Sequence, residues 1–246
     1  MTAKPPAFPL RGILTFPIVL LWALGYAGFV LGVFFLTPKR AQKNKDRYIR
    51  LWGIGILKIL GVHLEIYGKE NFDSGTVLYM PNHVSVLDLG LWCANWAGNT
   101  VVLYKKEFDK IPFLGRTLRR LQMIPIDRKN RERAVKSLEE AADCARKQGK
   151  SILIAPEGTR SKNGHLLPFK KGPFHLAIAA GIPIVPCIFC GITDIVPNGS
   201  WLARPGTVTV RFLSPVQTKN WTTETLDDHV AEIRKIFLGH LPDSSH

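Results

Sequence analysis

The fold is read most clearly from residues 131–158, whose sequence is RERAVKSLEEAADCARKQGKSILIAPEG. The first part of this stretch places small and apolar side chains at helical spacing on one face, at Ala134, Leu138, Ala141 and Ala145. Gly149 suits a helix end, because glycine readily adopts the left-handed conformation found there. Residues 152–155 form a short apolar run that ends in a Pro-Glu-Gly turn. The stretch therefore predicts a helix that leads directly into a buried strand.

The same alternation of strand and helix signals extends in both directions along the chain. We expect strands at residues 62–66, 76–80, 101–104, 123–126, 152–155, 182–189 and 208–212. We expect helices at residues 85–96, 113–121, 131–148, 174–180 and 223–238. This alternation predicts an α/β sheet with helices on its faces. In such folds, ligands bind at the loops beyond the strand ends.

The N-terminal part of the chain carries a long apolar segment. Residues 12–38 are 27 consecutive positions without a formal charge. About 20 apolar residues cross a bilayer, so the segment is long enough to span one and too long for a signal peptide core. A buried core helix is the alternative, although such helices are rarely apolar on all sides. The basic residues that follow are Lys39, Arg40, Lys43, Lys45, Arg47 and Arg50. We expect attachment to the cell (inner) membrane, and the positive-inside rule predicts that the remainder of the chain lies on its cytoplasmic side.

A second apolar segment follows at residues 47–60. It is too short and too charged to span a bilayer easily, and it predicts an amphipathic interfacial helix. The two segments form either a spanning helix followed by a surface helix, or a hairpin that dips into one leaflet, and both interpretations stay open. We therefore expect residues 1–60 to be membrane-anchoring helices and residues 61–246 to be a cytoplasmic α/β domain.

The composition limits the classes of function. The 246 residues include 33 Lys and Arg against 19 Asp and Glu, which gives a formal net charge of +14. This excess predicts an anionic partner, either a nucleic acid, an anionic membrane surface or a phosphorylated substrate. Four cysteines exclude a disulfide scaffold and fit a reducing compartment. Cys187 and Cys190 form a Cys-x2-Cys pair, but on a strand the two side chains point to opposite faces, which favours core packing over zinc binding.

A histidine and an aspartate follow the strand expected at residues 76–80. His83 comes just after this strand, and Asp88 lies in the first turn of the helix expected next. A carboxylate beside one ring nitrogen fixes the tautomer, so that the other nitrogen can take a proton from an alcohol. The alternative is structural, because Ser85 and Asp88 have the spacing of a capping box at a helix start.

A glycine-containing loop follows the strand expected at residues 152–155. Its sequence, Pro156-Glu157-Gly158-Thr159-Arg160-Ser161, combines backbone N–H groups, a hydroxyl and a guanidinium that can surround one anion. The alternative is a solvated turn with an exposed arginine. Lys105 and Arg128 also sit just past expected strands, which would place them at the same edge of the sheet as His83 and Arg160.

These clusters resemble the glycerolipid acyltransferase family, in particular the bacterial-type 1-acylglycerol-3-phosphate (lysophosphatidate) acyltransferases. The family's Asn-His-x4-Asp motif matches residues 82–88, its Pro-Glu-Gly-Thr-Arg-Ser motif matches residues 156–161, and its apolar Ile-Pro-Ile-Val-Pro run matches residues 182–186. Another motif usually begins with glycine and has an aromatic residue before Ile-Asp-Arg. Here Gln122 and Pro125 occupy those positions, whereas residues 126–128 fit.

The resemblance implies a central mixed sheet flanked by helices and a membrane-anchoring helical segment. It implies transfer of a fatty acyl group from acyl-CoA or acyl-carrier protein to the sn-2 hydroxyl of lysophosphatidate, giving phosphatidate. His83 would then be the general base and Asp88 the group that orients it. The resemblance assigns acceptor and phosphate binding to Lys105, Arg128, Glu157, Gly158, Thr159 and Arg160. It implies no metal and no cofactor, since the acyl thioester is a co-substrate. The partners expected are lysophosphatidate, the thioester and the lipid membrane.

The sequence leaves three alternatives open. A related acyltransferase would use glycerol-3-phosphate or another lysophospholipid as the acceptor. A non-catalytic membrane scaffold would keep the fold without the chemistry. A basic nucleic-acid-binding protein would explain the net charge, but aromatic residues are not interleaved with the basic ones, so we expect no nucleic acid partner.

Overall fold

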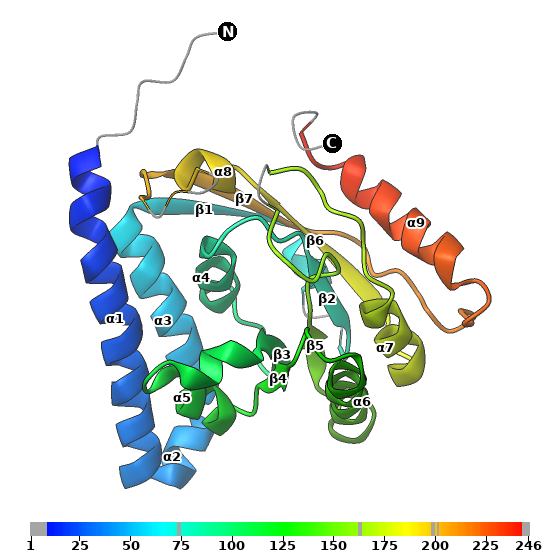
Figure 1. Ribbon diagram of the computed structural model, residues 1–246, viewed down its shortest axis with the longest axis horizontal. Coiled ribbons are helices and arrows are strands. Elements are labelled where there is room, and N and C mark those ends of the chain that lie inside the picture. Colours follow the sequence, from blue (N-terminus) through cyan, green and yellow to red (C-terminus); the bar gives the residue numbers. More distant parts are fainter. Residues whose placement is uncertain (1–8, 73–74, 162–163, 198–199, 201, 243–246) are drawn as a thin grey trace, which may run out of the picture.

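The computed structural model describes residues 9–72, 75–161, 164–197, 200 and 202–242. The strands are β1 (Val62–Tyr67), β2 (Leu78–Pro81), β3 (Thr100–Lys105), β4 (Ile124–Ile126), β5 (Ser151–Leu153), β6 (Ile184–Cys190) and β7 (Gly206–Phe212). They form one mixed sheet in the order β1-β7-β6-β2-β5-β3-β4 (Figure 1). The predicted α/β architecture with a mixed central sheet is therefore confirmed.

Helices precede the sheet, connect its strands and close the chain. The first are α1 (Pro9–Leu36), α2 (Pro38–Lys43) and α3 (Lys45–Leu60). The others are α4 (Leu87–Ala94), α5 (Leu114–Arg120), α6 (Arg131–Gln148), α7 (Gly172–Ala180), α8 (Ile192–Ile195) and α9 (Leu226–Leu238). Two short 3-10 helices are η1 (Lys69–Asn71) and η2 (Lys106–Lys110).

Strand direction sets where the loops meet. β2, β3, β4, β5 and β6 are joined by parallel pairings, whereas β7 pairs with β6 in the antiparallel sense. β1 runs parallel to β7 at the edge. The carboxyl ends of the five parallel strands therefore lie at one edge of the sheet, and the loops that leave them are neighbours.

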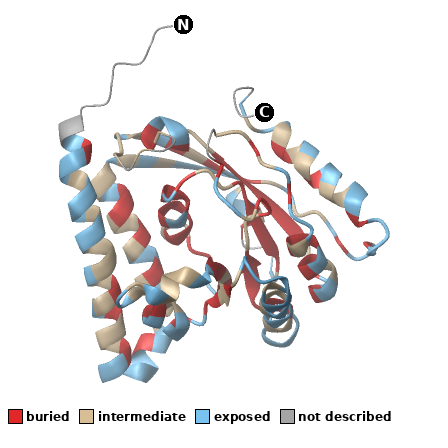
Figure 2. Ribbon diagram, in the orientation of Figure 1, coloured by how far each residue is buried: buried red, intermediate tan, exposed pale blue. Residues whose placement is uncertain are grey.

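Two apolar clusters form the core, one on each face of the sheet. Alternate residues of β2 supply both, because successive side chains of a strand point to opposite faces. Tyr79 packs with the cluster under α3 and α4, whereas Leu78 and Met80 pack with the cluster under α6, α7 and α9. Figure 2 shows the buried central strands between these two helical layers.

The helices α1 and α3 lie side by side and run in opposite directions (Figure 1). The indole N–H of Trp22 donates to the carbonyl of Trp52 at 3.1 Å, and the indole N–H of Trp52 donates to the carbonyl of Ala23 at 3.3 Å. Gly55 allows this approach, because a Cβ built there would lie 2.3 Å from the Trp22 ring. The pair is thus a tightly packed helical hairpin.

The hairpin is joined to the sheet through α3. A Cβ on Gly53 would lie 2.3 Å from the backbone nitrogen of Ala94, so the backbones of α3 and α4 are in close contact. Residues 1–8 of the expected anchor lie outside the described residues. The division at residue 60 stays a prediction, and α3 belongs to the same core cluster as α4.

The outer surface of α1 is apolar. Residues 11–36 have a mean hydropathy of 2.3 over their most apolar window, and 17% of that window is buried. The exposed apolar side chains include Leu21, Phe29, Phe35 and Leu36. By length and composition this is the one helix of the described residues able to cross a membrane. A fully buried core helix, the alternative considered from the sequence, would not leave these side chains uncovered.

Element boundaries differ from the expected ones where side chains compete for the backbone. The helix expected at residues 85–96 is α4, Leu87–Ala94, because the Ser85 hydroxyl accepts from the N–H of Leu87 and Asp88 accepts from the N–H of Ser85, which closes a turn before the helix. The strand expected at residues 152–155 is β5, which ends at Leu153 before the Pro156 turn. The short helices α2 and α8 were not expected, since each is less than two turns long and carries little periodicity.

Candidate active site

The loops that carry the predicted site residues meet at the carboxyl edge of the sheet. His83 follows β2, Lys105 ends β3, Arg128 follows β4, and residues 156–161 follow β5. These strands are parallel neighbours, so their carboxyl ends share one edge. In open α/β sheets this edge is where ligands bind.

His83 and Asp88 form a hydrogen-bonded pair. The distance from His83 Nδ1 to Asp88 Oδ2 is 2.6 Å. The same oxygen accepts from the backbone N–H groups of Val84 at 2.9 Å and Ser85 at 3.0 Å. The contacts that hold the turn before α4 and the histidine contact are therefore made by one carboxylate oxygen. With Nδ1 protonated, the Nδ1–H of His83 donates to this carboxylate oxygen, which leaves Nε2 as the basic nitrogen.

The exposure of the pair suits a proton acceptor. The side chain of His83 is 26% exposed, whereas that of Asp88 is 7% exposed. The carboxylate is thus shielded from solvent while the imidazole remains reachable. This combination allows a substrate hydroxyl to approach Nε2 without displacing Asp88.

Glu157 links the two loops that carry the motifs. Its Oε1 accepts from the backbone N–H of His83 at 2.7 Å, and its Oε2 accepts from the backbone N–H of Leu167 at 2.9 Å. The N–H of Ser161 donates to the carbonyl of His83 at 2.9 Å. Burial raises the pKa of Glu157, while the two N–H donors lower it. Both carboxylate oxygens therefore bind main chain, a contact that sequence spacing does not reveal.

Asn82 holds the other side of the His83 loop. It is 2% exposed, and its amide pairs with the backbone of Phe189 through bonds of 3.0 Å and 2.8 Å. The side chain thus extends the β2–β6 pairing by one residue past the strand. The sequence motif includes this asparagine, but it gives no indication of the partner on β6.

The turn after β5 needs a glycine. Gly158 has a φ of +68°, and a Cβ there would also approach Lys170 at 3.3 Å. The N–H of Lys170 donates to the carbonyl of Pro156 at 2.7 Å, which closes the loop. Thr159 and Arg160 follow on the exposed side of this turn. They are therefore open to a ligand in solution.

Two of the cationic side chains predicted to bind phosphate, Lys105 and Arg128, share one acidic neighbour. Lys105 Nζ lies 3.6 Å from Glu107 Oε1. The side chain of Arg128 is exposed, but the protein atoms around it lower its pKa. The carboxylate of Glu107 raises this pKa, whereas the positive charge of Arg160 lowers it. Arg128 and Arg160 are thus close enough to repel each other. Glu107 was missed from the sequence, because it lies in a short 3-10 helix outside any motif.

The described residues contain no cluster of three or more His, Cys, Asp or Glu side chains able to hold a metal ion. Cys187 belongs to the core cluster on one face of the sheet, and Cys190 packs against the core cluster on the other face. Burial raises the pKa of both thiols, as expected for packed cysteines.

A histidine–carboxylate pair and cationic side chains on neighbouring loops, at this edge of an α/β sheet, would suit an enzyme that activates a hydroxyl on an anionic substrate. The family model for Acyltransferase matches residues 63–190. The chain belongs to the acyltransferase family.

Named relatives extend the similarity beyond this region. The 1-acyl-sn-glycerol-3-phosphate acyltransferase of Limnanthes douglasii is 34% identical over 231 residues, covering 93% of this chain and 81% of the relative. The human enzyme named 1-acyl-sn-glycerol-3-phosphate acyltransferase alpha is 30% identical, covering 88% of this chain and 76% of the relative. The crystal structure of the 1-acyl-sn-glycerophosphate acyltransferase PlsC from Thermotoga maritima is similar with a TM-score of 0.79 and 27% identity, covering 94% and 93% of the two chains.

Proposed function

We propose that this acyltransferase transfers a fatty acyl group from a thioester to the sn-2 hydroxyl of 1-acyl-sn-glycerol-3-phosphate, which gives phosphatidate. The plant and human relatives and the Thermotoga maritima enzyme are named as acyltransferases that act on this acceptor, which supports the proposal. The observation that carries the proposal in this chain is the 2.6 Å contact between His83 and Asp88, at the same edge of the sheet as Lys105, Arg128 and Arg160.

His83 acts as the general base. The acceptor hydroxyl attacks the thioester carbonyl carbon while Nε2 of His83 takes the hydroxyl proton. The tetrahedral intermediate then collapses, the carbon–sulfur bond breaks, and the imidazolium returns the proton to the leaving thiolate. Asp88 stays ionised and stabilises the imidazolium through Nδ1–H. The chain has no Gly-x-Ser-x-Gly sequence, so no nucleophile elbow supports a covalent acyl-enzyme.

Lys105, Arg128 and Arg160 bind the phosphate of the acceptor, with help from Thr159. Arginine supplies two parallel donors to a phosphate, and lysine supplies a point charge. A phosphate between Arg128 and Arg160 would relieve the repulsion between their charges. Glu157 and Gly158 support this site by shaping the loop, because the carboxylate oxygens of Glu157 already accept from main-chain N–H groups.

The apolar helix α1 fits attachment to a lipid membrane, where both the acceptor and the product reside. The exposed apolar side chains of α1 are the support for this part of the proposal. The catalytic domain would then lie on the cytoplasmic side of the cell membrane, where acyl-CoA and acyl-carrier protein are both available as donors.

A thiol-release assay with a panel of acceptors tests the proposed function. Membranes that contain the protein receive acyl-CoA with lysophosphatidate, glycerol-3-phosphate, lysophosphatidylcholine or no acceptor, and the acyl-carrier-protein thioester is run in parallel. Thiol release that requires lysophosphatidate is the expected result. Release with another acceptor alone would overturn the substrate, and no release with either donor would overturn the proposed function.

A further inference from the structure

A second group of cationic side chains lies at the opposite edge of the sheet from His83. Lys150 directly precedes β5, and Gln122 lies two residues before β4, so both are at amino ends of strands. Gln122 Oε1 accepts from Lys150 Nζ at 3.1 Å, from Lys45 Nζ at 3.4 Å and from Gln42 Nε2 at 3.5 Å. Three donors, two from the α2–α3 region and one from the residue before β5, thus converge on one oxygen.

The two ammonium groups form no ion pair with a carboxylate among the described residues. Lys150 is 8% exposed, and no ion pair joins Lys150 or Lys45 to a carboxylate of the described residues. Asp46 neighbours Lys45 in sequence, but its Oδ1 accepts from the indole N–H of Trp96 at 2.7 Å. Burial of a cation is unfavourable unless an anion offsets it. The neutral amide oxygen of Gln122 offsets the charges of the two lysines only in part.

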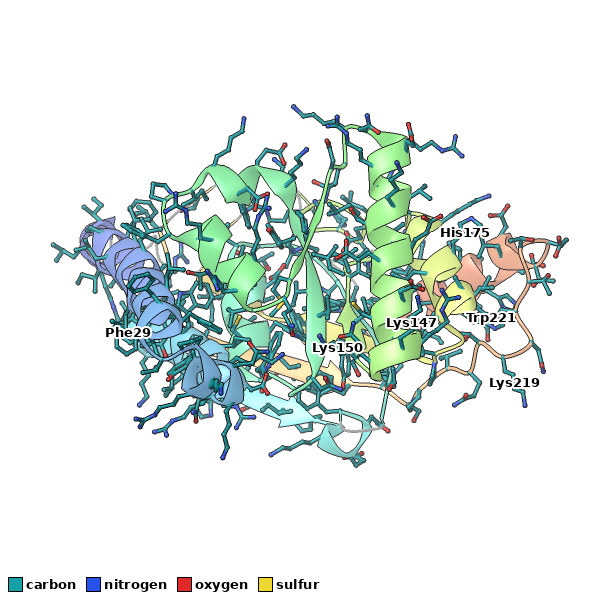
Figure 3. The ribbon with its side chains drawn as sticks, turned by 90° about the horizontal axis from the view of Figure 1, so that it is seen from below. Phe29, Lys147, Lys150, His175, Lys219 and Trp221 are labelled. Atoms are coloured by element: carbon teal, nitrogen blue, oxygen red, sulfur yellow. The ribbon has the colours of Figure 1, made fainter. Side chains whose placement is uncertain are left out.

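The charges at this position act on each other. Burial lowers the pKa of Lys45, the charge of Lys150 lowers it further, and Asp46 raises it. Repulsion between the two lysines is therefore present in the structure and would be relieved by an anion between them. Figure 3 shows Lys150 close to the end of α6, with Lys147 on that helix nearby.

Gln122 is held in a strained backbone conformation. Its φ is +63°, in the left-handed region that is unfavourable for residues other than glycine. Its side chain is exposed, so it can swing into solvent without leaving a buried cavity. An anionic oxygen in the position of Gln122 Oε1 would therefore interact more favourably with the two lysines than the neutral amide oxygen does.

We propose that Lys45, Lys150 and Gln42 form a phosphate-binding site in which a phosphate oxygen replaces Gln122 Oε1. Several donors around one oxygen suit a phosphate, and lysines bind phosphate as point charges. The site adjoins α2, which follows the exposed apolar end of α1 at Phe35 and Leu36. A lipid headgroup and free phosphate present the same chemistry to it. The site is separate from the candidate active site, because the two lie at opposite edges of the sheet.

Titration calorimetry with inorganic phosphate tests the site. The full chain in detergent micelles carries Arg160→Ala, which weakens phosphate binding at the candidate active site. Phosphate is compared with chloride at equal ionic strength. We expect phosphate binding to persist in this background and to weaken about tenfold with Lys150→Met or Lys45→Met, the change for losing one charge-assisted hydrogen bond. Gln122→Gly should strengthen binding, because it removes both the competing oxygen and the strain.

Lys147→Met is the matched control. Lys147 is exposed and paired with Asp143 at 2.8 Å on α6, so its loss should leave phosphate affinity unchanged. Melting temperatures without phosphate check that each variant folds, and Lys45→Met, at a partly exposed position, serves if Lys150→Met does not fold. Unchanged affinity in both lysine variants, or no phosphate binding in the Arg160→Ala background, would overturn the proposal.

Vesicles separate the two sources of phosphate. Binding to phosphatidylcholine vesicles is compared with binding to vesicles that also contain phosphatidylglycerol. A loss of the phosphatidylglycerol-dependent part in Lys150→Met, with the phosphatidylcholine part unchanged, assigns the site to a lipid headgroup. Lysine-dependent calorimetric binding without that loss assigns it to free phosphate.

Discussion

The backbone N–H of His83 donates to Glu157 Oε1 at 2.7 Å, across a separation of 74 residues. Through this bond, the loop after β5 fixes the main chain of the residue that we propose as the base. The second oxygen of Glu157 binds Leu167, so the carboxylate also closes its own loop. One buried side chain therefore couples the predicted base to the loop that carries Thr159 and Arg160.

Glu157→Gln should lower kcat about tenfold to hundredfold, because a small displacement of a catalytic group costs this much. The glutamine amide would place its NH2 group against the N–H of either His83 or Leu167, so one of the two hydrogen bonds is lost. The KM for the acceptor should change less than kcat, as measured by steady-state thiol release. Glu139→Gln, on the exposed face of α6, is the control and should retain activity. A raised acceptor KM with unchanged kcat would instead mean that Glu157 binds substrate directly.

The same carboxylate makes stability depend on pH. Burial raises the pKa of Glu157 in the folded state above that of the unfolded chain. A raised pKa contributes stability that is present at pH values below about 4.5, near the unfolded pKa, and is lost as the pH rises through the folded value. The stability of the wild type relative to Glu157→Gln should therefore fall as pH rises from 4 to 7. Urea unfolding across this range measures the difference, and a difference that is constant or increases with pH would contradict this assignment.

Asp88→Asn should lower kcat by about 10²–10⁴-fold, because the amide no longer selects the Nδ1–H tautomer of His83. It should also cost about 1 kcal/mol of unfolding free energy, since the N–H groups of Val84 and Ser85 lose a charged acceptor. Asp143→Asn removes an exposed carboxylate of α6 and should leave kcat unchanged. Activity of Asp88→Asn within a factor of two of the wild type would show that Asp88 only holds the turn before α4.

Arg128→Ala and Arg160→Ala should each raise the KM for lysophosphatidate about tenfold or more, the loss of a charge-assisted contact to phosphate. The KM for the thioester should stay unchanged. The two guanidinium groups repel each other, so removing one also removes this repulsion at the other. The KM of the double variant, compared with those of the two single variants, measures the coupling between the two arginines. An increase confined to the KM for the thioester would show that these arginines bind the thioester and not the acceptor phosphate. Lys129→Ala, at an exposed neighbouring position, is the control.

Gly55→Ala should loosen the packing of α1 against α3. The added Cβ would lie 2.3 Å from the Trp22 ring, and overpacking of this kind costs about 1–3 kcal/mol. Faster proteolysis between α1 and α3 is the expected observation. Gly32→Ala, where a Cβ on α1 meets nothing within 4 Å, should not increase cleavage. Equal cleavage in the two variants would contradict the tight contact between the helices.

The order of strand and helix elements could be predicted because it depends on local patterns. Residues 131–149 show this, since their periodicity and Gly149 define α6 to the residue. The strand order could not be predicted, because the insertion of β2 between β6 and β5 depends on pairings between distant segments. The antiparallel pairing of β6 with β7 is likewise absent from any local signal.

The candidate site was predictable where motifs placed residues after strands. Parallel pairing then brings the His83 loop and the Arg160 loop to one edge. The contacts that hold these loops were not predictable, because Glu157 reaches His83, and Asn82 reaches Phe189, only in the folded chain. The convergence of Lys45 and Lys150 on Gln122 was missed for the same reason.

The central claim is that His83 is the base that activates the acceptor hydroxyl. Lysophosphatidate-dependent thiol release by wild type and His83→Ala, at equal amounts of folded and membrane-bound protein, tests it most directly. We expect the variant to retain less than about 1% of the wild-type kcat, because general-base catalysis contributes 10²–10⁴-fold. Near-normal release by His83→Ala would contradict the claim and remove His83 from the chemistry.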